Sequence, residues 1–108
     1  EEVDEMHSLE LFDYRVERDA IRARIMYIDG FGNAVTNIHG DVVRELDAKA
    51  FYIDGTEFPL VETYSCAEEG EPIALIGSFN TLEFSVRNGS AAKAFGLKSG
   101  EVVLKWRK

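Results

Sequence analysis

The sequence predicts a mainly β domain, an antiparallel barrel or sandwich with one short helix near the C-terminus. Short apolar segments recur at close spacing, and turn residues such as Asp-Gly separate them. No internal repeat, coiled-coil heptad or parallel βαβ pattern is present in the sequence. With 108 residues, of which 45% are hydrophobic, the chain is large enough for one domain with a buried core.

The first part of the predicted sheet begins with a regular alternation. Over residues 21–27, apolar side chains alternate with Arg22 and Arg24, which is the period of a strand with one buried face. This strand leads into residues 27–38, which we interpret as an apolar strand that is kinked at two glycines. After it, residues 41–46 are predicted to form one or two helical turns.

Two hairpins are predicted in the middle of the chain. An Asp-Gly pair between two apolar segments is the strongest short hairpin signal, and it joins residues 48–53 to residues 57–64. The second hairpin joins residues 72–76 to residues 81–86 through a turn at residues 77–80. In its second arm, alternate residues are apolar, so we expect one face of that strand to be buried.

The C-terminal part holds the predicted helix and the last strand. Asn88 or Ser90 is expected to cap a helix over residues 91–95. Gly96 is expected to end this helix in the left-handed conformation. A final strand over residues 101–106 completes a set of about six strands.

The charge distribution excludes several classes of partner. The formal net charge is -8, and residues 1–19 hold eight acidic residues and two arginines, whereas residues 20–108 hold twelve acidic and ten basic residues. We therefore expect an acidic linker or N-terminal extension over residues 1–19 and a nearly neutral domain over residues 20–108. Without a basic stripe, neither nucleic acid nor a membrane is expected as a partner. A single cysteine, Cys66, and the lack of an export signal favour a cytoplasmic location.

Residues 27–38 carry the most informative side chains. A carboxylate, two amides, an aromatic ring and two glycines interrupt this apolar segment at Asp29, Gly30, Phe31, Gly32, Asn33 and Asn37. Such a group suits a small polar ligand with a flat base. The alternative is a tight turn, in which Asp and Asn side chains bond their own backbone. The residues by themselves leave both interpretations open.

Other reactive side chains lack the partners that metal binding or catalysis requires. His7 and His39 are not at metal-ligand spacing with acidic residues or with the cysteine, so no metal site is expected. Ser65, Ser78 and Ser85 have no evident His and Asp partners, which argues against nucleophilic catalysis. Four large aromatic residues are expected in the core: Phe58, Phe84, Phe95 and Trp106.

Several motifs in order resemble one enzyme family. They are IDGFGNAVTNI at residues 28–38, Tyr64, GEPIALIGS at residues 70–78, Leu82-Glu83 and NGSAA at residues 88–92. Together they resemble the C-terminal domain of the S-adenosyl-L-methionine (SAM) hydroxide adenosyltransferases, the group that includes the fluorinase and chlorinase. The resemblance covers roughly residues 15–108 and implies a single antiparallel β-barrel domain.

The resemblance also implies partners. Members are two-domain enzymes, usually trimers, in which a larger N-terminal domain activates water or a halide and the barrel closes the SAM pocket from a neighbouring subunit. We therefore expect SAM and adenosine as ligands, a missing N-terminal domain and a homotrimer at full length. SAM is the substrate and no cofactor is expected. Because no catalytic residue is expected in this chain, the isolated domain should be inactive, and since the chain does not begin with Met, we expect a fragment or processed chain.

The resemblance assigns four side chains to the substrate. Asp29 corresponds to the residue that binds the methionine ammonium, and a charge-assisted hydrogen bond suits that task. Phe31 and Asn33 correspond to residues that hold the adenosyl group. Ser78 corresponds to the hairpin serine at the methionine end. We expect the segment with Asp29, Phe31 and Asn33 and the turn with Ser78 to lie side by side at one end of the barrel. Together with Asn88 they should surround one open groove.

Three further positions complete the implied site. Backbone groups near Val86 and Asn88 correspond to those that read the adenine edge. Tyr64 takes the place of an aromatic residue that packs on the base. Adenine carries no charge, so ring stacking and edge hydrogen bonds are the interactions that recognise it.

Departures from the family pattern favour a SAM hydrolase over a halogenase. Halogenating members have an arginine after the hairpin serine, where this chain has Phe79, which cannot bind a carboxylate. Asn80 replaces a glycine of that turn, and it tolerates a left-handed backbone. Val35 stands where the fluorinase has a bulky aromatic residue. The alternatives are part of a SAM-dependent halogenase, or a non-catalytic oligomerisation or ligand-binding β-barrel.

Overall fold

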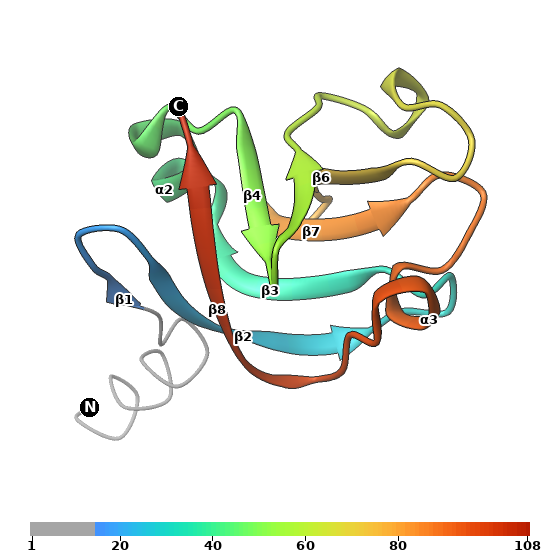
Figure 1. Cartoon of the computed structure of the whole chain (residues 1–108), viewed down its shortest axis with the longest axis horizontal. Coiled ribbons are helices and arrows are strands. Elements are labelled where there is room, and N and C mark those ends of the chain that lie inside the picture. Colours follow the sequence, from blue (N-terminus) through green and yellow to red (C-terminus); the bar gives the residue numbers. More distant parts are fainter. Residues whose placement is uncertain (1–14) are drawn as a thin grey trace.

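The computed structural model describes residues 15–108, which form a mainly β domain with a strongly curved sheet (Figure 1). Within these residues the strands are β1 Arg15–Val16, β2 Ile21–Ile28, β3 Ala34–His39, β4 Ala50–Ile53, β5 Thr56–Pro59, β6 Pro72–Ile76, β7 Thr81–Val86 and β8 Gly100–Arg107. The helices are α2 Gly40–Leu46, α3 Ala91–Phe95 and the 3-10 helix η1 Tyr64–Cys66. The first fourteen residues of the predicted linker lie outside the described residues.

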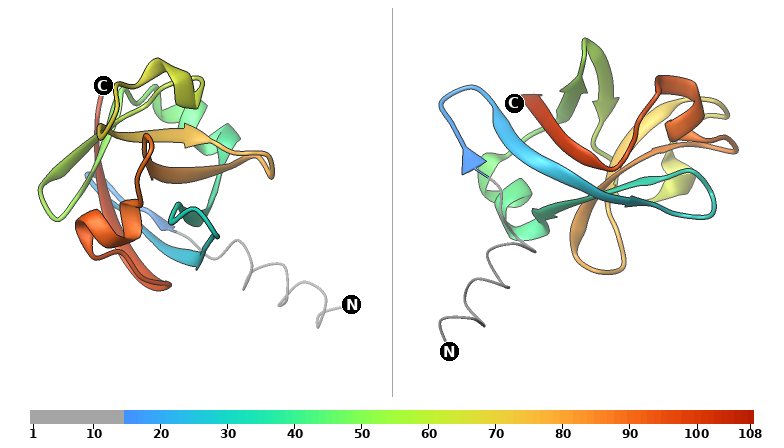
Figure 2. Two further views of the ribbon diagram at one scale, coloured as in Figure 1. Left: turned by 90° about the vertical axis from the view of Figure 1, so that its right-hand side faces the viewer. Right: turned by 90° about the horizontal axis from the view of Figure 1, so that it is seen from below.

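The sheet is an almost closed antiparallel barrel, which confirms the predicted fold class. Its strand order is β5-β4-β8-β2-β3-β7-β6, and β1 pairs with β2. The long strand β8 turns the sheet, because its first half pairs with β2 and its last three residues pair with β4. At the open edge, Val61 N donates to the carbonyl of Ala74 in β6 over 2.8 Å, and Leu60 bridges Ala74. The curvature is clear in the two views of Figure 2.

The core lies inside this curved sheet. In β2 the predicted alternation holds, with Ile21 and Ile25 buried. Phe58 and Phe84 are fully buried, and their rings meet edge to face at 5.0 Å. Trp106 packs against this core and remains partly buried. Phe95 is more exposed than predicted, at 36%, although its ring contacts Phe58 at 5.3 Å.

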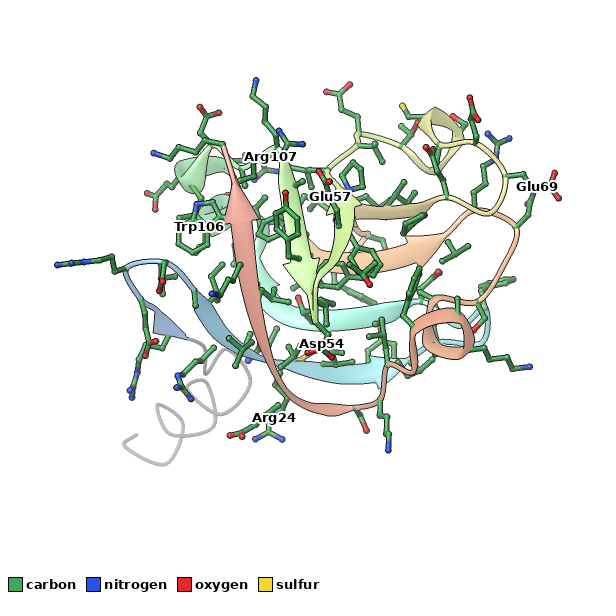
Figure 3. All side chains as sticks on the ribbon, in the orientation of Figure 1. Arg24, Asp54, Glu57, Glu69, Trp106 and Arg107 are labelled. Carbon is green, nitrogen blue, oxygen red and sulfur yellow. The ribbon has the colours of Figure 1, made fainter. Side chains whose placement is uncertain are left out.

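An ion pair spans the strands at the C-terminal end of the sheet. β4 lies between β5 and β8 in the sheet order. Arg107 Nη2 of β8 lies 2.8 Å from Glu57 Oε2 of β5 (Figure 3). Both side chains are about half exposed, at 50% and 42%, so solvent screens the pair and it contributes little to the free energy of unfolding.

The predicted turns have the expected chemistry. Asp54 and Gly55 both have positive φ, 50° and 85°, as a tight hairpin turn requires. Asn80 takes the left-handed conformation expected of it, with φ of 60°. Ser90, rather than Asn88, caps α3, because its hydroxyl accepts a hydrogen bond from Lys93 N.

Two boundaries differ from the sequence prediction. Residues 27–38 are not one kinked strand, because β2 and β3 pair with each other and residues 29–33 form the turn between them. The strand predicted over residues 57–64 ends at Pro59, which pairs with the first residue of β4, Ala50. The helical turns predicted over residues 41–46 are confirmed as α2, which begins one residue earlier, at Gly40, and gives the domain a second α-helix. Within the described residues, no helix is both long and apolar enough to cross a membrane.

Candidate functional site

The turn between β2 and β3 is held together by one carboxylate. Asp29 Oδ1 accepts hydrogen bonds from the backbone N–H groups of Phe31 (2.9 Å) and Asn33 (3.0 Å), and Asp29 Oδ2 accepts one from Asn33 Nδ2 (3.1 Å). Partial burial raises the pKa of Asp29, but these hydrogen bonds lower it more, so the net pKa lies below its ordinary value. The tight-turn interpretation of this segment is therefore correct for Asp29 and Asn33.

This turn packs directly on the start of α3. Gly32 has a φ of 85°, and a Cβ at this position would overlap the side chain and backbone of Ser90. The Gly32 carbonyl accepts a hydrogen bond of 3.0 Å from the N–H of Ala92. Glycine at position 32 thus meets both the conformational need and the close approach. Gly30 has neither constraint, since its φ is not left-handed and no atom would lie within 4 Å of an added Cβ.

The turn and the segment after β7 line an open groove. Its walls are formed by Phe31, Asn33, Asn88 and Gly89. The Phe31 ring is 81% exposed, which is unusual for a large apolar side chain. Beside it, Asn33 Oδ1 is buried and accepts no hydrogen bond within the described residues. The groove therefore offers a flat apolar surface, and a buried hydrogen-bond acceptor without a partner lies in its wall.

Ser78 lies in a different groove. That groove is formed by α2, the segment after β5 and the turn at residues 77–80. The expectation that both turns share one end of the barrel is wrong, because β3 and β7 run antiparallel. The residues 29–33 precede β3, whereas Asn80 contacts the far end of β3, where its carbonyl accepts a hydrogen bond of 2.8 Å from Gly40 N.

Comparison with known proteins identifies the family. Residues 23–104 match the model of the SAM hydroxide adenosyltransferase C-terminal domain. The chain belongs to this family. The resemblance predicted from the sequence motifs is therefore confirmed.

Relatives of this SAM hydroxide adenosyltransferase domain are longer proteins. An (R)-S-adenosyl-L-methionine hydrolase of Thermus thermophilus is 36% identical over 76 residues, which cover 70% of this chain and 28% of the relative. A conserved hypothetical protein of Thermus thermophilus has a similar structure, with a TM-score of 0.64, 30% identity and coverage of 80% and 34%. An uncharacterized conserved protein of Thermotoga maritima shares the fold, with a TM-score of 0.76, 24% identity and coverage of 87% and 38%. The chain thus spans roughly a third of the length of these proteins.

The remaining predicted site residues do not all lie in the groove at Phe31. Val86 is buried at the end of β7, and its carbonyl accepts a hydrogen bond from Gly89 N. Asn88, which follows in a left-handed conformation with φ of 58°, is exposed in the groove. Tyr64 begins η1, and its side chain lies outside the described part of the structure. Asn37 is fully buried away from the turn, where its Oδ1 accepts a hydrogen bond from Arg24 N.

Sequence reasoning gave no role to Glu83, which the structure places against Gly77 and within electrostatic reach of Asp29. Glu83 lies in β7, paired in register with Val35 of β3 and Leu75 of β6. Its carboxyl group lies against Gly77, where any Cβ would overlap it. Burial, and then the charge of Asp29, raises the pKa of Glu83 above its ordinary value. In the sequence, Glu83 is the one charged residue of Thr81–Val86, and this pattern alone gives no sign of its burial.

Metal binding finds no support in the part of the chain that the structure describes. Among residues 15–108, no three His, Cys, Asp or Glu side chains gather closely enough to hold a metal ion. His39 contacts Asp41 at 3.6 Å in an exposed pair near α2. This pair is separate from the groove at Phe31.

Replacing Asp29 with asparagine is expected to destabilise the domain by about 1 kcal/mol at neutral pH, because the carboxylate accepts three hydrogen bonds in the turn. Since its folded pKa is lowered, this stability is present above the unfolded pKa near 3.8 and is lost as the pH falls through the folded pKa. Chemical denaturation at several pH values measures the difference. Asp41→Asn, which removes an exposed carboxylate, is the control. Equal loss in both variants would contradict the structural role of Asp29.

Proposed function

We propose that this domain binds the adenosyl group of SAM in the groove beside Phe31, as the C-terminal part of a SAM hydrolase. The reaction of such an enzyme converts SAM and water to adenosine and methionine. The observation that supports the proposal most is the exposed Phe31 ring in a groove that Asn33 and Asn88 also line. The family and the named hydrolase relative support it independently.

Adenine has the chemistry that this groove is suited to recognise. Its uncharged ring stacks on an aromatic side chain, and each stacked base contributes about 1 to 3 kcal/mol to binding. Its exocyclic amino group is a donor, and Asn33 Oδ1, which is buried in the structure, is proposed to accept from it once the Asn33 side chain shifts towards the ligand. The hydrogen bond from Asn33 Nδ2 to Asp29 fixes which end of the amide carries the oxygen. Backbone groups near Val86 and Asn88 are proposed to meet the other edge of the base.

The domain is proposed to clamp the substrate, with the water-activating groups on another domain. The sulfonium of SAM is a good leaving group, so displacement at the 5′ carbon depends mainly on in-line positioning and on exclusion of bulk water. We propose that an N-terminal domain of a neighbouring subunit, in a trimer, completes the groove. Two large exposed aromatic side chains support such a contact, since Phe31 is 81% and Phe79 73% exposed.

A hydrolase is proposed over a halogenase because of the turn after β6. Phe79 follows Ser78 there, and its exposed ring offers no positive charge to a ligand carboxylate. The methionine end of the ligand is instead proposed to meet Ser78 itself. Tyr64 is retained as a proposed contact of the base.

Replacing Phe31 with alanine tests the proposal. We expect Phe31→Ala to weaken adenosine binding by about 5- to 100-fold, because stacking is lost, and to leave the free energy of unfolding nearly unchanged, because the ring is exposed. Two-dimensional NMR shift mapping with adenosine detects even millimolar affinity. Phe79→Ala, which removes another strongly exposed ring from the turn at residues 77–80, is the matched control and should bind adenosine normally.

Two results would overturn the adenosyl site. One is equal weakening of adenosine binding in Phe31→Ala and Phe79→Ala. The other is the absence of adenosine-dependent shifts at residues 29–33 and 88–89 in the unmodified protein. The latter result would favour a barrel that serves assembly alone.

A further inference from the structure

Glu83 lies between the two turns that the resemblance assigns to opposite parts of the ligand. Its register partners are Val35 and Leu75, so it projects from the middle strand of the β3-β7-β6 segment. The turn at residues 29–33 lies beyond one end of β7, and the turn at residues 77–80 precedes the other end. The six residues of β7 span roughly 17 Å at about 3.4 Å per residue. A single elongated ligand that reached both turns would pass over Glu83.

The carboxylate of Glu83 has no partner in the described part of the chain. No hydrogen bond or ion pair to it is formed among residues 15–108, although the side chain is partly buried. A desolvated carboxylate without a partner is unfavourable, and such groups concentrate at functional sites. Gly77 makes room for this carboxylate, since a side chain there would overlap it.

Asp29 is less available to a ligand than Glu83. Its Oδ1 already accepts two hydrogen bonds, which use both lone pairs, and its Oδ2 accepts one. Asp29 therefore has one acceptor position left, whereas both oxygens of Glu83 are unused. The two carboxylates are near enough for the Asp29 charge to act on Glu83, so a cation between them would relieve their repulsion.

We propose that Glu83 is a further substrate-binding residue, whose carboxylate accepts hydrogen bonds from the ammonium group of the ligand while the adenine lies on Phe31. The proposal deepens the proposed SAM site and rests on it. The ammonium has three donors, of which Glu83 takes one or two and Asp29 Oδ2 takes another. The ligand then runs along the outer face of β3 and β7, from the groove at residues 29–33 towards Ser78.

The unligated protein provides a first test that involves no ligand. Because the folded pKa of Glu83 is raised, its ionised form destabilises the fold above the unfolded pKa near 4.5, and this penalty disappears as the pH falls below it. Glu83→Gln keeps the shape of the side chain and removes the charge. We expect a higher thermal midpoint than wild type at pH 7 and little difference at pH 4. A lower midpoint at pH 7 would show that the carboxylate serves the fold, and the proposal would fail.

Binding of three ligands provides the second test. Adenosine has no cationic group, S-adenosylhomocysteine has the ammonium alone, and SAM has both ammonium and sulfonium. We expect Glu83→Gln to bind adenosine normally and to bind the other two about 10- to 100-fold more weakly, since a charge-assisted hydrogen bond is lost. NMR titration measures all three affinities. Glu45→Gln, an exposed acid on α2, is the matched control and should bind all three normally.

The outcomes separate this inference from the proposed function. If wild type binds none of the three ligands at residues 29–33, the adenosyl site itself is wrong. If adenosine binds there and Glu83→Gln leaves S-adenosylhomocysteine unaffected, the role of Glu83 alone is wrong. Weakening of SAM without weakening of S-adenosylhomocysteine would assign Glu83 to the sulfonium and overturn the ammonium assignment. Glu83→Asp, which keeps the charge on a shorter side chain, should restore part of the lost affinity.

Discussion

Phe84→Ala is expected to lower the free energy of unfolding by about 3 to 5 kcal/mol. The Phe84 side chain is fully buried, and its ring meets the rings of Phe51 and Phe58 edge to face. Its register partners on both sides are alanines, Ala34 in β3 and Ala74 in β6. These small neighbours cannot fill the space that the ring leaves, so a cavity would remain in the centre of the barrel.

Such a loss is a large part of the roughly 5 to 15 kcal/mol that holds a typical domain folded. Chemical denaturation followed by circular dichroism measures it, with Phe79→Ala as the control, because that ring is 73% exposed. Because β7 also carries Glu83 and leads to Asn88 in the groove, we expect Phe84→Ala to lower ligand affinity as well as stability. A loss below about 1 kcal/mol would mean that the core collapses around the missing ring.

Local patterns predicted most of the fold. The alternation in β2, the Asp-Gly turn and the second hairpin depend on neighbours in sequence, so their signals are complete within a few residues. The boundaries predicted for β6 and β7 agree with the structure. Helix α3 was predicted from its cap and its final glycine, which are also local.

The relation between distant segments was not readable from the sequence. Apolar residues flank the turn at residues 29–33 on both sides, so the sequence pattern resembles one continuous strand. The hydrogen bonds to Asp29 close the turn that divides it into two strands. Which ends of β3 and β7 meet depends on their register, and this placed Ser78 in a separate groove from Phe31. The bridge between Leu60 and Ala74, which nearly closes the barrel, also joins segments that are distant in sequence.

Glu83 shows most clearly why the candidate site was only partly predictable. A single acid in a strand normally faces solvent, and nothing adjacent in sequence indicates otherwise. Gly77, six residues away, leaves the space in which its carboxyl group lies, and the charge that acts on it comes from Asp29, on another hairpin. The sequence contained both Gly77 and Asp29, but their proximity to Glu83 is a consequence of the folded register.

Gly32→Ala is expected to have the largest effect on the groove itself. Position 32 has a φ of 85°, which costs a residue with a side chain about 1 to 2 kcal/mol, and the new Cβ would overlap Ser90. We expect a loss of about 2 to 4 kcal/mol in the free energy of unfolding, or displacement of the turn from α3. Displacement would break the hydrogen bond from Ala92 N and separate Phe31 from Asn88.

The effect of Gly32→Ala on adenosine binding tests whether the packing of this turn shapes the ligand site. If adenosine needs Phe31, Asn33 and Asn88 together, Gly32→Ala should weaken it more than Phe31→Ala does, because all three contacts depend on where the turn packs. Gly30→Ala is the matched control, since its added Cβ meets nothing within 4 Å. NMR titration with adenosine, beside denaturation of both variants, measures the two effects. Normal adenosine affinity in a folded Gly32→Ala protein would mean that the packing of this turn on α3 does not shape the ligand site.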